Sequence, residues 1–277
     1  MPVEPLKRAL GQLFGRSEEG DAPHRPSREE VRVVLAEGRG LVGADLSGLD
    51  LSGMEMVGAD LRETNLEGAN LRGCRLAGSR LNGARLCGAD LTGAGLARAD
   101  LSNANCLRTG ADADRPVLLR EADLSDATLV GCNLAHGDLS GANLERAALR
   151  EAHLSHADLT GADLNGAMLN GANLRHARLQ GASFAGADLS TADLTRAAAA
   201  RAIFAGAKMR RSSLVECDLQ RADLAESDLS ESDLSRADLR HATLRGATVT
   251  SADFDEALLD GADLTELADG SAYNLSR

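Results

Sequence analysis

A large apolar residue recurs at every fifth position along most of this chain. From residue 41 to residue 101 each such position holds Leu or Met, in 13 of 13 cases. A second series runs from Leu124 to Leu264, where 28 of 29 positions hold Leu, Phe, Met or Val and the exception is Ala199. Two residues before these central positions of the second series the side chain is always small, and it is Ala in 23 of 29 cases. Self-similarity of this kind is typical of a solenoid.

The period of five excludes the ordinary secondary structures. In an α-helix, which turns by about 100° per residue, every fifth leucine would be rotated by about 140° and would spread around the axis. In a strand the side chains alternate between two faces, so an odd spacing would flip successive leucines. The chain has no Trp, one Tyr and four Phe, so few large side chains are present to fill a thick core. We therefore expect the chain to coil around a narrow column of its own leucines.

The repeat unit has a definite family resemblance. Segments such as 157–161 (ADLTG) and 222–226 (ADLAE) resemble the A(D/N)LXX signature of the pentapeptide-repeat family. The match covers residues 41–106 and 117–266. The resemblance implies an all-β fold, a right-handed, quadrilateral parallel β-helix with four pentapeptides per coil. It also implies that the central residue and the small residue before it point inward, while Asp or Asn and the last two positions point outward.

The number of repeats sets the size of the expected rod. The two series contain 13 and 29 central positions, so 42 repeats would form roughly 10–11 coils and a rod about 50 Å long at the ordinary strand spacing of ~4.8 Å. Neighbouring coils of a solenoid stabilise one another, so one poor repeat is a local defect. Ala199 is expected to be such a defect, because the missing leucine would leave a void or a bulge.

The two series are out of register with each other. We divide the chain into a first run of repeats at 41–106, an inserted loop at 107–116 and a second run at 117–266, with about eight residues more than one repeat needs. The loop is interpreted either as a tolerated surface insertion or as a contact loop. Protruding loops also occur in family members that bind type II topoisomerases. The charged candidates for partner contact in the loop are Arg108, Asp112, Asp114 and Arg115.

Residues 1–40 do not repeat and carry no net charge. Residues 27–30 (SREE) form a capping box ahead of an apolar pattern, and Gly38 is placed to end a helix, which predicts a helix over 28–37 that covers the open first coil. An N-terminal amphipathic helix is also expected, followed by a polar linker at 17–26; it would pack on the rod, form a mobile arm, or anchor a partner or membrane. Its apolar residues are Leu6, Ala9, Leu10, Leu13 and Phe14.

The C-terminal tail, residues 267–277, is short and shows no helical pattern. Its apolar residues Leu267, Tyr273 and Leu275 would cover the last coil or meet a second copy of the chain. The resemblance brings in homodimerisation, because gyrase-protecting members of the family commonly dimerise through this end. The sequence leaves a homodimer through the C-terminal end open.

The charge of the chain argues against direct contact with nucleic acid. The formal net charge is -12, with 42 acidic and 30 basic residues, so phosphates would be repelled and a basic protein surface would be attracted. Residues 119–277 hold 25 of the acidic and 15 of the basic residues, a net charge of -10. The repeat register places four aspartates of one coil on four successive sides, as an acidic ring. The acidic candidates for partner contact around this ring are Glu216, Asp218, Asp223, Glu226, Asp228, Glu231, Asp233 and Asp238.

No set of residues in the sequence converges on a catalytic, cofactor or metal site. There is no phosphate-binding loop, zinc-type cysteine pairing or nucleophile elbow, so we predict no enzyme and no cofactor. Cys87 is expected to point outward, and Cys106 replaces a central leucine. Histidines at 136, 156 and 176 would stack about 4.8 Å apart in one column. Parallel imidazoles converge poorly on a metal, so this column is interpreted mainly as an exposed ladder.

Two functions fit this chain. The first is a non-enzymatic, acidic rod that mimics DNA and binds DNA gyrase or topoisomerase IV, thereby modulating or protecting it from drugs or toxins, as family resemblance suggests. The second is a general protein-interaction scaffold, such as a secretion-associated or effector module. No apolar run is long enough to span a membrane and the N-terminus lacks a signal-peptide pattern, so we expect a cytoplasmic protein.

Overall fold

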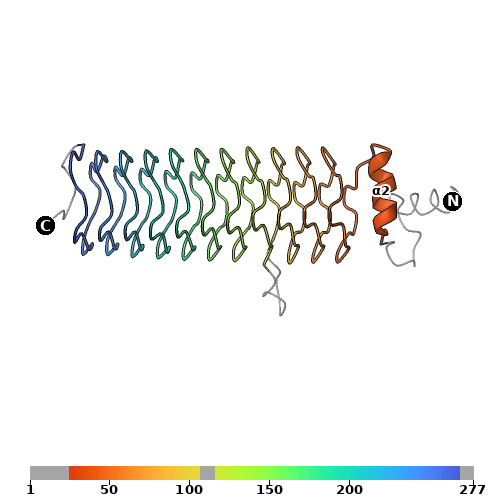
Figure 1. The fold of residues 1–277 in the computed structure, drawn as a ribbon, viewed down its shortest axis with the longest axis horizontal. Coiled ribbons are helices and arrows are strands. Elements are labelled where there is room, and N and C mark those ends of the chain that lie inside the picture. Colours follow the sequence, from red (N-terminus) through yellow and green to blue (C-terminus); the bar gives the residue numbers. More distant parts are fainter. Residues whose placement is uncertain (1–24, 107–115, 269–277) are drawn as a thin grey trace, which may run out of the picture.

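The fold is a rod built by one chain that coils repeatedly around a single long axis (Figure 1). The computed structural model describes residues 25–106 and 116–268. Backbone bridges are parallel and join residues 20 positions apart, as in Asp138↔Asp158 and Asp158↔Arg178. One coil therefore contains four pentapeptides, with one bridge in each. Within the described ranges every bridge is an isolated pair, and no longer strand occurs.

Each pentapeptide contributes one tight turn and a set of links to its neighbours. In residues 157–162 the amide of Ala162 donates to the Leu159 carbonyl at 3.0 Å and closes the turn. The amides of Leu159 and Gly161 donate to the next coil at 2.8 and 3.0 Å, and that of Asp158 donates to the previous coil at 2.9 Å. Gly161 has a φ of 66°, the left-handed value that the third residue of a type II turn requires. The same turn position also holds long side chains, including Arg196 with a φ of 59°.

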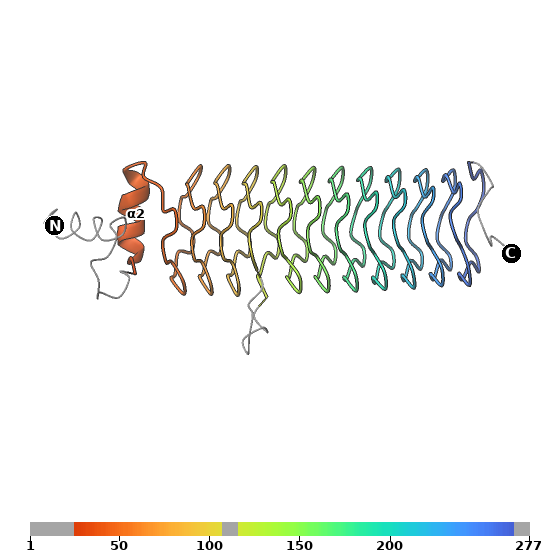
Figure 2. The same ribbon diagram turned by 180° about the vertical axis from the view of Figure 1, so that it is seen from behind.

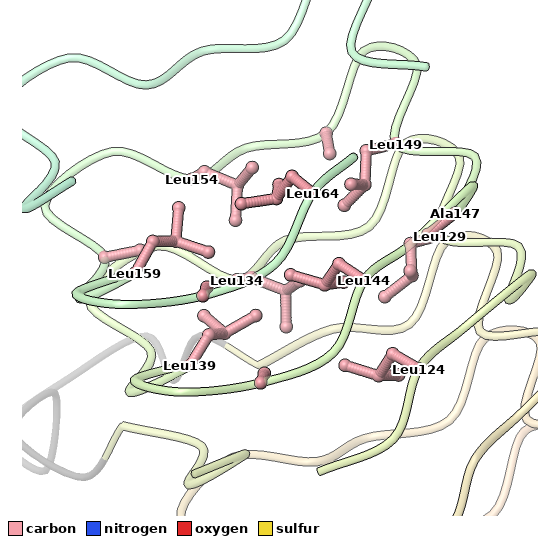
Figure 3. Close-up of a cluster of buried hydrophobic side chains, with 14 of the residues drawn as sticks. Leu124, Leu129, Leu134, Leu139, Leu144, Ala147, Leu149, Leu154, Leu159 and Leu164 are labelled. Carbon is pink, nitrogen blue, oxygen red and sulfur yellow. The ribbon is translucent and has the colours of Figure 1, made fainter. Parts of the chain in front are cut away.

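The core is a set of leucine columns that run along the rod. Leu124, Leu144 and Leu164 follow one another in one column on successive coils, and Figure 3 shows them pointing into the interior. The small residues beside them, such as Ala147, are equally buried. Phe184 and Phe204 replace leucine on adjacent coils, and their rings stack with centroids 4.9 Å apart. The central residues of the repeat thus form the apolar interior, and each side of the coil contributes one layer of side chains to it.

Ala199 does not interrupt the coil. Its amide donates to the Asp218 carbonyl at 2.8 Å, and the amide of Ala202 donates to the Ala199 carbonyl at 3.0 Å, as in the regular repeats. The side chain is fully buried. The expected bulge is therefore absent at this repeat. The next central residue of the same coil is Phe204, which is larger than leucine.

The register shift between the two runs leaves the rod continuous. Across it, bridges such as Asp90↔Leu118 and Asn105↔Asn133 join residues 28 positions apart, so 28 − 20 = 8 residues are extra, in agreement with the sequence. Figure 2 shows regular coils on both sides of the point where the chain leaves the rod. The chain leaves after Cys106 and returns at Pro116. Residues 107–115 lie outside the described ranges.

Cys87 corrects one expectation, because its side chain is buried rather than outward. It occupies the same corner as Ala135, and these two residues lie on the coils before and after the exit of the chain at Cys106. Both are buried, with 4% and 6% of their surface exposed. The corresponding position in most other repeats is half-exposed.

Helix α2, Arg28–Ala36, lies across the N-terminal end of the rod (Figure 1). It begins at the capping box that the sequence indicates: the Ser27 amide donates to the Glu30 carboxylate at 2.6 Å, and the Ser27 hydroxyl accepts from the Glu30 amide at 3.3 Å. Val31 and Val34 are fully buried against the first coils. The guanidinium of Arg28 donates to two backbone carbonyls of the rod, at 2.9 and 2.6 Å. The helix therefore packs its apolar side chains into the same core as the leucines of the first coils.

Candidate protein-interaction surface

The acidic ring occupies one coil in the C-terminal half of the rod. Asp223, Asp228, Asp233 and Asp238 are consecutive bridge residues, and each pairs with a residue 20 positions away on both neighbouring coils. They therefore lie on four successive sides, as the sequence register indicates. Asp218 precedes Asp238 in one of these columns.

The carboxylates of the ring have a structural task that the sequence reasoning missed. One oxygen of Asp223 accepts a hydrogen bond from the Ala225 amide at 3.0 Å, and Asp228 and Asp233 accept from the amides two residues ahead at 3.0 and 2.9 Å. Asn173 makes the same contact with its amide oxygen, at 3.1 Å. These contacts hold the side chain in one orientation beside the turn. The recurrence of Asp or Asn two residues before a turn is the signal that reveals this role.

Arginines neutralise three of the predicted acidic residues. Glu216 pairs with Arg196 at 2.7 Å, and Glu231 pairs with Arg211 at 2.6 Å. Hydrogen bonds from these arginines lower the pKa of both carboxyl groups below their ordinary values. Asp238 is neutralised in the same way by an arginine two residues ahead, at 2.6 Å, and its pKa is also lowered. These three carboxylates are less able to attract a basic partner.

The other five predicted acidic residues keep an uncompensated charge. Within the described ranges none of them forms an ion pair within 4.0 Å. Four are bridge residues on four successive sides of the rod, and the fifth lies at an exposed corner. They are Asp218, Asp223, Asp228, Asp233 and Glu226. This unpaired acidic set is the part of the predicted surface that remains strongly negative.

The remaining predicted residues do not join this surface. The loop candidates Arg108, Asp112, Asp114 and Arg115 lie outside the described residues. The rings of His136, His156 and His176 are parallel, with centroids 4.8 Å apart between coils, as the register predicts. A ladder of parallel rings directs its nitrogens to different points. In the part of the chain that the structure describes, no group of three or more His, Cys, Asp or Glu side chains is arranged to hold a metal ion.

Comparison with known families identifies the repeat. A family model described as pentapeptide repeats matches overlapping segments that together cover residues 41–105 and 118–266. The chain belongs to the pentapeptide-repeat family. The matched segments end and restart at the interruption seen in the rod, and they exclude helix α2. A search of curated proteins found no match.

Several solved pentapeptide-repeat proteins are similar to this chain over much of its length. HetL, a protein involved in heterocyst differentiation regulation in the cyanobacterium Nostoc, is 29% identical over 89% of this chain and 96% of its own, with a TM-score of 0.42. A trypsin-treated form of QnrB1, a plasmid-mediated fluoroquinolone resistance protein, is 16% identical over 83% of this chain and 91% of its own, with a TM-score of 0.48. A pentapeptide repeat protein of the Arabidopsis thaliana thylakoid lumen is 24% identical over 54% of this chain and 68% of its own, with a TM-score of 0.13.

Proposed function

We propose that this chain is a non-enzymatic binding protein whose acidic rod occupies the DNA-binding surface of a type II topoisomerase, DNA gyrase or topoisomerase IV. The observation that carries the proposal is the set of unpaired carboxylates at Asp218, Asp223, Asp228 and Asp233. They surround the rod in the region where acidic residues outnumber basic ones by ten, 25 against 15. A rod with such a surface would be attracted to a basic saddle that normally holds duplex DNA.

The expected binding is electrostatic and therefore depends on salt. Exposed charges are screened beyond a Debye length of about 8 Å at physiological ionic strength. Full-length protein is expected to inhibit DNA supercoiling by gyrase, or to relieve the effect of a quinolone, and the effect should weaken steeply as salt is raised. No effect on either enzyme at low salt would refute the topoisomerase proposal.

The repeat offers a substitution that removes charge without disturbing the fold. Asn occurs at bridge positions such as Asn143 and Asn173 and accepts the same turn hydrogen bond as Asp, at 3.1 Å in both cases. Replacing four aspartates of the unpaired set by Asn lowers the negative charge by four and should preserve the melting curve. This variant, called the ring variant below, carries Asp218→Asn, Asp223→Asn, Asp228→Asn and Asp233→Asn, and it leaves the arginine-paired Asp238 unchanged.

A matched control removes the same charge elsewhere on the rod. It carries Asp→Asn substitutions at Asp100, Asp123, Asp163 and Asp188, which are also bridge residues, accept the same turn hydrogen bond and form no ion pair within the described ranges. The proposal predicts that the ring variant loses most of its effect on the topoisomerase while the control variant keeps it. Equal losses would mean that net charge alone matters, and the ring would then not be the contact.

The alternative function is a protein-interaction scaffold without a topoisomerase target. Ion pairs between coils favour it, because Arg236–Glu256 at 2.7 Å and Arg146–Asp126 at 2.8 Å give much of the surface a mixed charge. A scaffold would show no topoisomerase effect, and crosslinking followed by mass spectrometry would identify its partner. Loss of that crosslink in the ring variant would place the partner on the acidic ring.

Four further features belong to the same proposal. We take the coil to be right-handed, helix α2 to act as the N-terminal cap and the protein to be cytoplasmic. No helix in the described ranges is long and apolar enough to cross a membrane. At the other end, Leu259 and Leu264 are only partly buried, which supports association of two copies through the C-terminal coil. Sedimentation analysis would test this, and a monomer at micromolar concentration would reject the dimer.

A further inference from the structure

A basic groove crosses four successive coils at one corner of the otherwise acidic rod. Its volume is about 720 Å³. The lining residues all come from the last two positions of pentapeptides that follow one another along the same corner. They are Gln180, Gly181, Ala200, Arg201, Gln220, Arg221, Arg240 and His241. This lining contains three arginines and no carboxylate.

The groove forms because the side chains at this corner differ in size from one coil to the next. Gly181 and Ala200 are small, so the surface is low at one end. The long side chains of Arg201 and Arg221 rise from the two coils that follow the coil of Gly181. At the far end the ring of His241 lies over Gly261, where an added Cβ would approach its Nδ1 to 2.5 Å. The sequence therefore produces a hollow bordered by cations.

Two of these cations have no partner. Arg201 and Arg221 form no ion pair and no side-chain hydrogen bond within the described residues, whereas Arg196, at another corner, is paired with Glu216 at 2.7 Å. The amide of Arg201 donates to the Gln220 carbonyl at 2.9 Å, so the two arginines lie on adjacent coils. Adjacent coils are ~4.8 Å apart, a spacing at which like charges repel. An anion between the two guanidinium groups would replace that repulsion with attraction.

Arg240 and Gln180 add donors at either end of the pair. Arg240 donates to both carboxylate oxygens of Asp238, from Nε at 2.9 Å and from Nη2 at 2.6 Å, which fixes its guanidinium and leaves the other terminal nitrogen for a ligand. The Oε1 atom of Gln180 is buried and has no hydrogen-bond partner. An amide can be turned to exchange its oxygen and nitrogen, and the buried position would then present an N–H group to an anion.

We propose that this groove binds a compact, multiply charged oxyanion of the phosphate class. Arginine forks match the oxygens of phosphate, and the groove presents two unpaired forks and a third that is held in place. A long polyanion such as duplex DNA is disfavoured, because the sides next to this corner carry Asp218, Asp223 and Asp238. The proposal is independent of the topoisomerase proposal, because it uses a basic corner and not the acidic ring.

The test is calorimetric titration of the full-length chain with inorganic pyrophosphate in metal-free buffer. We expect saturable binding of one anion per chain. The variant Arg201→Gly/Arg221→Gly should bind at least about tenfold more weakly, since each charged hydrogen bond lost contributes a comparable factor. Both positions have a left-handed φ, 60° and 57°, and glycine occupies the same corner position at Gly181, so the variant should fold at least as well.

The matched control is Arg98→Gly/Arg236→Gly. It removes two arginines from the same kind of turn position, at corners away from the groove, and should bind pyrophosphate as the unchanged protein does. Arg98 is unpaired within the described residues, like the groove arginines, whereas Arg236 is paired with Glu256 at 2.7 Å. Equal weakening in the control, or no saturable binding at low salt, would overturn the site. Citrate that binds as tightly as pyrophosphate would overturn the assignment to phosphate. A short DNA duplex that competes more strongly than pyrophosphate would overturn the assignment to a compact ligand.

Discussion

Replacing Ala199 by Leu tests whether the coil has compensated for its missing leucine. Ala199 lies in the column of Leu179 and Leu219, which are fully buried like Ala199 itself. If the missing side chain left a void, Ala199→Leu would fill it and recover roughly 2–5 kcal/mol, the usual cost of a Leu-to-Ala cavity. If Phe204 fills the space, the same substitution overpacks the coil and costs about 1–3 kcal/mol. The sign of the change therefore decides between the two.

We predict that Phe204 compensates for the missing leucine and that Ala199→Leu is therefore destabilising. The backbone hydrogen bonds of Ala199 have ordinary lengths, 2.8 and 3.0 Å, so the coil has not collapsed inward to close a gap. Phe204 is the next central residue of the same coil, and Phe184 stacks on it at 4.9 Å. The double variant Ala199→Leu/Phe204→Leu restores the two leucines of a regular coil and should recover most of the lost stability.

Urea and thermal unfolding followed by far-ultraviolet circular dichroism would measure these effects, because the chain has no Trp and one Tyr. At roughly 2–4 °C per kcal/mol for a chain of this size, the single variant should melt at least about 2 °C lower. Leu159→Ala, in the same column two coils away, is the matched control for an uncompensated cavity and should cost about 2–5 kcal/mol. A higher melting temperature for Ala199→Leu would refute the compensation.

Three further predictions concern the turns, the thiols and the carboxylates. Gly261→Ala should lower the free energy of unfolding in urea by about 1–2 kcal/mol or more, because φ at Gly261 is 71° and the new Cβ would lie 2.5 Å from His241 Nδ1. A second substitution, His241→Ala, should restore only the part of this loss that comes from the contact with the ring. Burial raises the pKa of Cys132 to about 12, so this thiol should resist a disulfide reagent at pH 8 until urea unfolds the rod; rapid labelling of the folded protein would contradict this burial. Hydrogen bonds from Arg240 lower the pKa of Asp238 in the folded protein. The stability that this carboxylate contributes is therefore fully present above the pKa of an unfolded Asp, near ~3.9, and is lost as the pH falls through its lower pKa in the folded state. When the pH is lowered from 5 to 3, the melting temperature of the Asp238→Asn variant should therefore fall less than that of the unchanged protein. An equal fall would contradict the stabilising pair of Arg240 and Asp238.

The sequence predicts the path of the chain because one short pattern decides it in every repeat. The central residue and the small residue before it, for example Leu159 and Ala157, fix which side chains are buried, and the period of five fixes the coil. Once one coil contains four repeats, the column of every residue follows by counting. The stacked histidines at 136, 156 and 176 and the ring at 223–238 were predicted in this way.

The pattern could not predict how exposed side chains pair within a column. Whether Arg196 reaches Glu216 or stays free depends on rotamers and on neighbours in three dimensions, and the repeat places both kinds of arginine at equivalent positions. The burial of Cys87 is not predicted either, because its repeat position usually holds a half-exposed side chain. The pattern also misses the groove at Arg201 and Arg221, because this groove results from small residues at one corner that lie beside unpaired cations on the same and the following coils.

The aspartates show why acidity alone is a weak guide to function in this fold. Asp223 and Asn173 accept the same turn hydrogen bond, so the coil needs a side-chain oxygen at this position and does not need a charge. A high count of Asp can therefore arise from turn geometry without any basic partner. Turn geometry does not explain why Asp rather than Asn occurs on four successive sides of the rod. These aspartates are unpaired, whereas arginines neutralise Glu216 and Glu231 nearby. An Asp-to-Asn series separates the two causes, since it changes the charge and keeps the hydrogen bond.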